Sequence, residues 1–170
     1  MNSIEYRREN QELVSIEGLY FNITEFSINQ DVVLPVILNL SDLAYEMSDE
    51  NARSDDSGLY LKSVFEIDRL VESNFLHLLN RNEIEIYLNS LREDENWPEF
   101  NRIFKQSINK FLSHPYTKCL NDLYVINKDD FDINSKVVVE REFRAYGFYL
   151  LLIWVCNEQR SFYTCEWSDE

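Results

Sequence analysis

The chain has 170 residues, of which 45% are hydrophobic and 14% aromatic, and its three glycines and three prolines are too few for a linker-rich or disordered chain. We therefore expect one globular domain over residues 1–170, without disulfide or metal staples. With 16 basic and 31 acidic residues the net charge is −15 at pH 7, which disfavours binding to nucleic acids and anionic membranes and attracts cationic partners.

The first residues lack the apolar core of a signal peptide, and no run in the sequence reaches transmembrane length, so we expect a cytosolic protein. Residues 11–26 are rich in β-branched and aromatic side chains around Gly18, a pattern typical of one bent strand or a short hairpin. A helical period starts at Asp31, a plausible N-cap, with Pro35 near the first turn. It predicts a first helix of about four turns.

The middle of the chain carries the strongest helical patterns. Apolar residues at steps of three and four predict an amphipathic helix over residues 59–80. A shorter helix capped by Asn82 is expected up to Leu91, and another with Pro98 in its first turn runs to Leu112, where His114 and Pro115 stop it. Residues 116–124 are expected to add a short helix.

The longest uninterrupted apolar run is 148–156, which has the length of a strand buried on both faces. Residues 157–160 are polar and residues 161–167 alternate loosely, so the two segments predict an antiparallel hairpin. A four-residue turn sets the following pairs opposite each other: Trp154 and Tyr163, Leu150 and Trp167, Val155 and Phe162, Cys156 and Ser161, and Leu152 and Cys165.

Residues 136–146 begin with β-branched side chains and predict a strand paired to the central strand 148–156. The alternative is one long helix over 137–156, but Gly147 favours a break. The expected fold class is therefore α+β, with a helix-rich middle of about four to five helices packed on a C-terminal antiparallel sheet, which an N-terminal strand could join.

Residues that could carry catalysis are few. His77 and His114 have no second histidine or cysteine at metal-ligand spacing, and glycines are isolated, so neither a zinc site nor a phosphate-binding loop is indicated. Cys119, Cys156 and Cys165 are odd in number and lack metal-like spacing, and are expected to be reduced thiols.

One carboxylate cluster invites comparison with a calcium-binding loop. Asp130, Asp132 and Asn134 match the first three ligand positions of an EF-hand, but Ser135 and Arg141 stand where that loop requires glycine and glutamate. We therefore expect no metal, no cofactor and no enzymatic activity.

The acidic residues concentrate in three polar segments that we expect to be exposed loops. Because an exposed carboxylate can meet a cationic groove without a folding cost, these loops are the candidate partner-binding surface. The candidate residues are Asp49, Glu50, Asp55, Asp56, Glu93, Asp94, Glu95, Asp129, Asp130 and Asp132.

In its size, acidity, cytosolic character and lack of catalytic motifs, the chain resembles bacterial immunity proteins of toxin–immunity pairs, of the contact-dependent growth inhibition or colicin-like kind. This resemblance implies a basic toxin partner, such as a nuclease, whose active site is occluded; it assigns no residues.

Two alternatives remain open. One is a nucleic-acid mimic that inhibits a DNA-binding protein, although mimicry favours acids in long rows rather than in loops. The other is an acidic accessory or regulatory domain whose charge only keeps it soluble.

Overall fold

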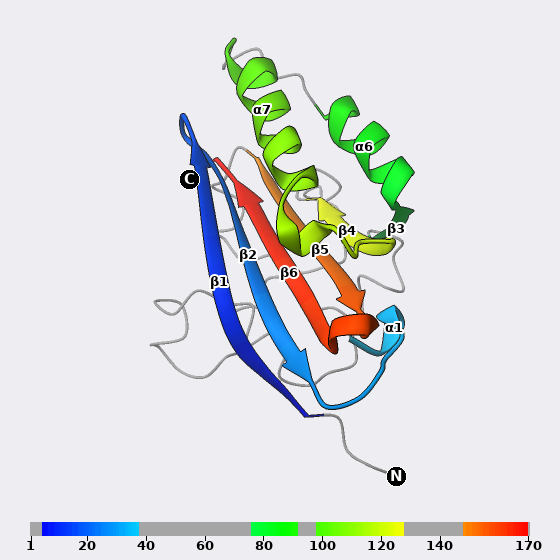
Figure 1. Ribbon diagram of the computed structural model, residues 1–170. Coiled ribbons are helices and arrows are strands. Elements are labelled where there is room, and N and C mark those ends of the chain that lie inside the picture. Colours follow the sequence, from blue (N-terminus) through cyan, green and yellow to red (C-terminus); the bar gives the residue numbers. More distant parts are fainter. Residues whose placement is uncertain (1–4, 38–75, 92–97, 128–147, 170) are drawn as a thin grey trace, which may run out of the picture.

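The computed structural model describes residues 5–37, 76–91, 98–127 and 148–169. Their core is one six-stranded antiparallel sheet with the strand order β1-β2-β6-β5-β4-β3 (Figure 1). Its strands are β1 (Tyr6–Ile16), β2 (Leu19–Ile28), β3 (Leu76–Asn80), β4 (Asp122–Asn127), β5 (Tyr149–Cys156) and β6 (Ser161–Ser168). The helical elements are α1 (Leu34–Ile37), α6 (Arg81–Ser90), α7 (Phe100–Leu112) and the short 3-10 turns η1 (Pro115–Thr117) and η4 (Asn157–Gln159).

Helices α6 and α7 lie side by side on one face of the sheet (Figure 1). The apolar stripe of α7 faces the strands, and Phe111 meets Trp154 edge to face at a centroid distance of 5.8 Å and Trp167 at 5.1 Å. On the opposite face Phe26 and Phe162 stack at 4.6 Å, and both are fully buried. Strands β2, β5 and β6 are therefore shielded on both faces, which explains the apolar run in β5.

The C-terminal hairpin confirms the sequence analysis. β5 and β6 are antiparallel, and all five predicted pairs occur, from Leu150 opposite Trp167 to Cys156 opposite Ser161. The turn contains η4 and Arg160, whose φ of 50° closes the connection. Trp154 and Tyr163 stack at 5.4 Å, so an aromatic pair stabilises this hairpin.

The N-terminal segment forms a hairpin, one of the two predicted alternatives. Glu17 and Gly18 both have positive φ, 47° and 95°, as a two-residue type I′ turn requires, and glycine takes this conformation at little cost. β2 then pairs with β6 along its length. The first and last strands of the chain are thereby joined in one sheet.

The predicted helix-rich α+β architecture is wrong. Among the described residues only α6 and α7 exceed one helical turn, and the structure is mainly sheet. The last part of the predicted helix 59–80 is strand β3, and the rest of it, residues 59–75, lies outside the described residues. In place of the short helix predicted over residues 116–124, the turn η1 is followed by strand β4. Non-local pairing of β3 with β4 and of β4 with β5 overrides the local helical pattern.

Three further expectations change. β4 pairs with one side of β5, where we expected residues 136–146 to pair. Residues 136–146 lie outside the described residues, and so does the part of the alternative helix 137–156 up to residue 147. Helix α1 begins at Leu34, three residues after the predicted cap, and only its single turn is described.

In α6 the capping residue is Asn80 rather than Asn82. The side chain of Asn80 accepts from the N–H of Glu83 at 2.9 Å, and the side chain of Glu83 accepts from the N–H of Asn80.

Within the described ranges no helix has the length and apolar character needed to cross a lipid bilayer.

Candidate functional site

A row of side chains crosses the helix-covered face of the sheet near the end of α7. Asn10, Glu25, Tyr163 and Trp154 stand opposite one another on β1, β2, β6 and β5. Glu25 continues the inward-facing series of β2, whose earlier members are apolar and fully buried. A carboxylate therefore occupies a position that the alternation of the strand directs toward the core layer.

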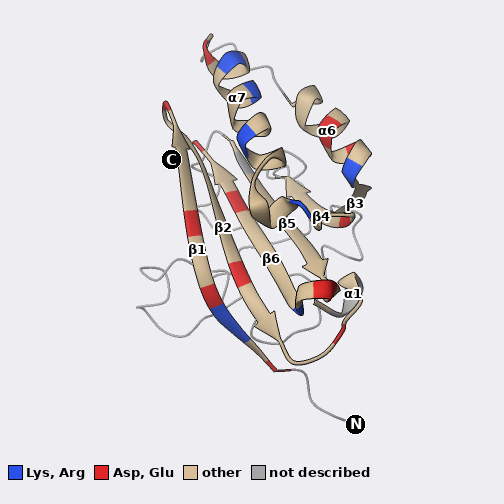
Figure 2. Cartoon of the chain, viewed as in Figure 1, with Lys and Arg blue, Asp and Glu red and all other residues tan. Residues whose placement is uncertain are grey.

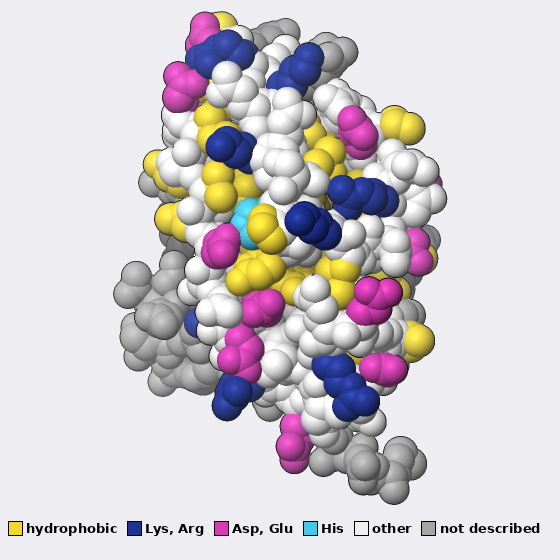
Figure 3. Space-filling model, in the orientation of Figure 1, with side chains coloured by type: hydrophobic (Ala, Val, Ile, Leu, Met, Phe, Trp, Pro, Cys, Tyr) yellow, Lys and Arg dark blue, Asp and Glu magenta, His cyan; other side chains and the backbone are white. Residues whose placement is uncertain are grey.

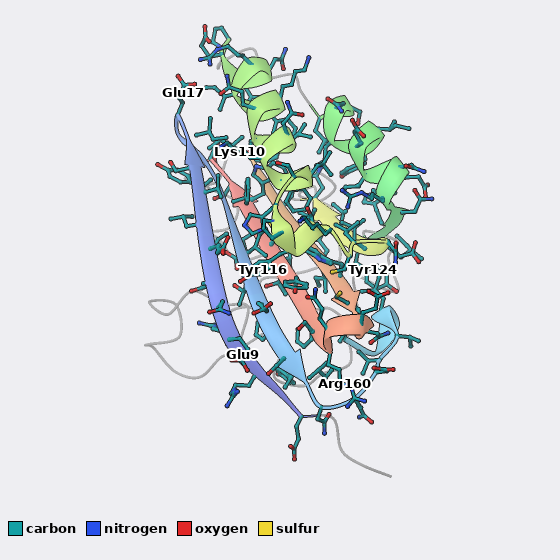
Figure 4. The ribbon with its side chains drawn as sticks, viewed as in Figure 1. Glu9, Glu17, Lys110, Tyr116, Tyr124 and Arg160 are labelled. Atoms are coloured by element: carbon teal, nitrogen blue, oxygen red, sulfur yellow. The ribbon has the colours of Figure 1, made fainter. Side chains whose placement is uncertain are left out.

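The turn after α7 places Tyr116 over this row. The guanidinium of Arg81 donates to the carbonyl of Leu112 at 3.1 Å and to the carbonyl of Thr117, which holds the turn against the start of α6. The indole N–H of Trp154 donates to the carbonyl of Tyr116 at 3.0 Å. The ring of Tyr116 packs on that of Tyr163 at a centroid distance of 5.0 Å, in front of β6 (Figure 4).

Glu25 is held by neutral donors. The side-chain amide of Asn10 donates to Oε1 at 2.9 Å, and the hydroxyl of Tyr163 lies 3.1 Å from Oε2 and 3.1 Å from Oε1 of Gln159. We call Asn10, Glu12, Glu25, Tyr116 and Tyr163 the tyrosine–carboxylate site. Its floor, Tyr163, is buried, whereas Asn10 and Glu12 are exposed at its rim.

Glu12 is anchored by His114. The backbone N–H of Tyr116 donates to Nδ1 of His114 at 3.1 Å, so this nitrogen carries no proton and Nε2 carries the ring proton. Nε2 meets the carboxylate of Glu12, whose side chain is 49% exposed. The imidazole is therefore a neutral donor that orients Glu12 without cancelling its charge.

The two phenols of the site are neutral in the free protein. Burial, then the charges of Glu25 and Glu12, raise the pKa of Tyr116, and burial followed by the charge of Glu25 raises the pKa of Tyr163. Both phenols therefore remain protonated at neutral pH. Within the described ranges no lysine or arginine pairs with Glu12 or Glu25. Two carboxylates beside a tyrosine ring suit a guanidinium or ammonium group, which can pair with the acids and contact the ring.

Helix α7 has the opposite character. α7 carries Arg102, Lys105 and Lys110 and no acidic residue, while acidic residues mark β1 and β2 (Figure 2). Figure 3 shows basic side chains, with some acidic ones among them, over the helices and acidic side chains along the neighbouring strand edge. Arg102 bridges Glu17 at 2.9 Å and Glu99 at 2.8 Å, and so ties the β1–β2 turn to α7.

An open groove of about 330 Å³ lies between α6 and α7. Its lining combines amide, basic and apolar side chains and includes no acidic residue, so it lacks the negative charge that would bind a cation. Its lining residues are Asn89, Asn101, Arg102, Phe104, Lys105 and Ile108.

The thiols of Cys119 and Cys165 are not activated. Cys119, Cys156 and Cys165 are free, burial and the neighbouring Cys156 raise the pKa of Cys119 to about 12, and burial raises that of Cys165. A thiolate is the nucleophilic form, so these two groups are poor nucleophiles at neutral pH. Among the described residues no group of histidine, cysteine, aspartate and glutamate side chains is arranged to hold a metal ion.

None of the acidic residues chosen from the sequence can be placed. Asp49, Glu50, Asp55, Asp56, Glu93, Asp94, Glu95, Asp129, Asp130 and Asp132 all lie outside the described residues, as do the remaining positions of the calcium-loop comparison. His77 lies in β3, not in a helix, with its ring 5.6 Å from that of Tyr87. Sequence reasoning missed Glu12 and Glu25, although a glutamate in the inward-facing series of β2 was a usable signal.

Comparison of the chain with protein-family models, with curated proteins and with solved structures found no match.

Proposed function

We propose that this chain is an acidic binding protein of the cytosol that neutralises a basic protein partner, and that it acts as an immunity protein which occludes the active site of a toxin such as a nuclease. It has no catalytic activity of its own and needs no metal or cofactor. Its partner is a protein, and neither nucleic acid nor a membrane is bound directly.

One observation carries this proposal. In a chain of net charge −15, the tyrosine–carboxylate site presents Glu12 and Glu25 on a rigid sheet without a basic partner from the described residues. Such a site is already ordered before binding, so a cationic side chain would gain charge-assisted hydrogen bonds with little ordering of the receptor. The excess negative charge would also speed the encounter at low salt.

The acidic loops chosen from the sequence remain part of this proposal. They would add long-range attraction, whereas the tyrosine–carboxylate site would supply a contact that is partly desolvated. Exposed acids at the rim of an interface mainly affect the association rate, and a partly buried acid affects the dissociation rate.

The charge layout does not favour the nucleic-acid mimic. A mimic presents carboxylates in rows that replace phosphates, but α7, the longest described helix, exposes Arg102, Lys105 and Lys110. The free thiols of Cys119, Cys156 and Cys165 suit a reducing compartment such as the cytosol.

The test is co-purification from the native host, followed by identification of the partner and assay of its activity with and without the chain. We expect a basic protein whose toxic or enzymatic activity falls at an equimolar ratio. A double variant, Glu12→Gln with Glu25→Gln, should inhibit less well, and Glu85→Gln on the exposed surface of α6 is the matched control. Recovery of only acidic or neutral partners, or an uninhibited basic one, would contradict the proposed function.

A further inference from the structure

β1 forms one edge of the sheet and is its longest strand, with eleven residues (Figure 1). The opposite edge, β3, has five residues. A short edge strand offers few backbone groups to an incoming chain, whereas a long one is a template for strand addition unless something blocks it. β1 is therefore the edge at which the sheet can be extended.

The hairpin turn determines which backbone groups of β1 point outward. In a two-residue type I′ hairpin the residues flanking the turn, here Ile16 and Leu19, form a hydrogen-bonded pair, and hydrogen-bonded pairs then alternate with non-hydrogen-bonded ones. The residues in the non-hydrogen-bonded pairs turn their N–H and C=O groups away from β2. These residues are Gln11, Leu13 and Ser15.

The outward groups of Gln11, Leu13 and Ser15 have no backbone partner in the described part of the chain. The side chain of Leu13 is 67% exposed, the largest exposure among the apolar residues of this sheet whose side chains are described. The N-terminal half of β1 is different, because a bulge interrupts its register between Arg8 and Asn10, and bulges and charges are devices that block an edge. Residues 11–15 lack such a bulge.

We propose that residues 11–15 of β1 receive an extended basic segment of the partner protein, which adds a strand to the sheet by hydrogen bonding to Gln11, Leu13 and Ser15. This inference rests on the proposed function, because it takes the basic partner as given and assigns the place and form of its contact.

The side chains on either side of β1 define the segment. On the helix-covered face Glu12 lies beside Glu25, so the residue opposite Glu12 would be a lysine or arginine. On the other face the exposed Leu13 calls for an apolar residue. The added strand therefore alternates basic and apolar residues. A second copy of the chain fits less well, since it would bring together two molecules of charge −15.

The first experiment uses the full chain and a short blocked peptide in which lysine and valine alternate, with a glutamate–valine peptide as its control. The lysine peptide should shift the amide resonances of Gln11, Leu13 and Ser15 and slow their hydrogen exchange, and the glutamate peptide should not. Shifts confined to other elements, or equal binding of the two peptides, would overturn the proposal.

The second experiment separates the outward N–H from the side chain. Leu13→Pro removes this N–H without removing a bond to β2, and Leu13→Val retains it. We expect Leu13→Pro to lower the affinity for the lysine peptide about tenfold or more, since several hydrogen bonds of the added strand depend on the outward N–H of Leu13. Leu13→Val should change this affinity by about twofold or less. If Leu13→Pro unfolds, Ser15→Pro makes the same test. Equal affinity of the proline and valine variants would refute strand addition.

Two outcomes keep this inference distinct from the proposed function. If the purified basic partner is inhibited equally by Leu13→Pro and Leu13→Val, strand addition at β1 is wrong and the proposed function stands. If the lysine peptide binds at β1 but no basic protein is neutralised, the proposed function fails and the edge site stands. A dimer in sedimentation that Leu13→Pro dissociates would show that a second copy occupies the edge, and would overturn the basic segment as its occupant.

Discussion

Glu12 on β1 and His114 after α7 are joined through the Nε2–H of a neutral imidazole, whose Nδ1 at the same time accepts the backbone N–H of Tyr116. One histidine thus fastens the edge strand to the turn that carries Tyr116. An asparagine side chain at position 114 can replace the Nδ1 acceptor but is too short to reach Glu12. Mutation can therefore separate the two hydrogen bonds.

We predict that His114→Ala lowers the free energy of unfolding by about 1–3 kcal/mol, since it leaves the Tyr116 N–H without its acceptor, and that His114→Asn costs less. A double-mutant cycle of His114→Asn with Glu12→Gln should give a coupling of about 1 kcal/mol, which is modest because Glu12 is half exposed. Urea denaturation measures all three values. A coupling indistinguishable from zero would show that the contact does not fasten β1.

Ile153 lies in the centre of β5 and is fully buried on the face away from the helices. Ile153→Ala should lower the free energy of unfolding by about 2–5 kcal/mol, because the lost side chain leaves a cavity that neighbouring strands cannot fill. Leu13→Ala on the exposed edge is the control and should change stability by about 0.5 kcal/mol or less. Equal costs for the two variants would mean that β5 is not the centre of the core.

Stability should fall at alkaline pH. Burial raises the pKa of Cys165 and of Tyr163 in the folded state above their ordinary values of 9.0 and 10.0. Above about pH 9 the unfolded chain loses these protons first, the folded state binds more protons, and the free energy of unfolding decreases as pH rises. Urea titrations at several pH values from neutral upward measure the slope, and Tyr163→Phe should reduce it. A free energy of unfolding that is constant through this pH range, or a slope that Tyr163→Phe does not change, would contradict the burial of these groups.

Hydrogen exchange should distinguish the centre of the sheet from its edge. We expect the amides of residues 150–154 to be among the slowest, since these residues of β5 pair with both β4 and β6. In β1 the amides of Glu12 and Val14 should be protected by β2 and those of Leu13 and Ser15 should exchange rapidly. Uniform protection along β1 would mean that its outer edge is already paired.

The C-terminal hairpin was predictable because its information is local. A run that is apolar on both faces, followed by a polar turn of four residues, determines both the strand and its register, and Trp154 stands opposite Tyr163 as predicted. β3 was not predictable in this way. Leu78 and Leu79 fit the end of a helical stripe, and only the pairing of β3 with β4, far away in the sequence, makes them a strand.

The tyrosine–carboxylate site depends on register in the same way. Glu12 and Glu25 are thirteen residues apart and look unrelated until the β1–β2 hairpin sets Asn10 opposite Glu25 and Glu12 opposite Ile23. Tyr116 reaches them only through the turn after α7, which Arg81 and Trp154 hold by hydrogen bonds to its backbone. A search for runs of acids in loops therefore could not find this site.

Recognition of a basic protein by this acidic chain is tested by the association rate of the chain with its purified partner at two ionic strengths. If an acidic surface recognises a basic protein, the rate constant should fall about tenfold or more from low to physiological salt. Glu12→Gln with Glu25→Gln should increase the dissociation rate, while Glu85→Gln leaves it unchanged. An association rate independent of salt, together with unchanged dissociation from the double variant, would show that the acidic surface does not recognise the partner.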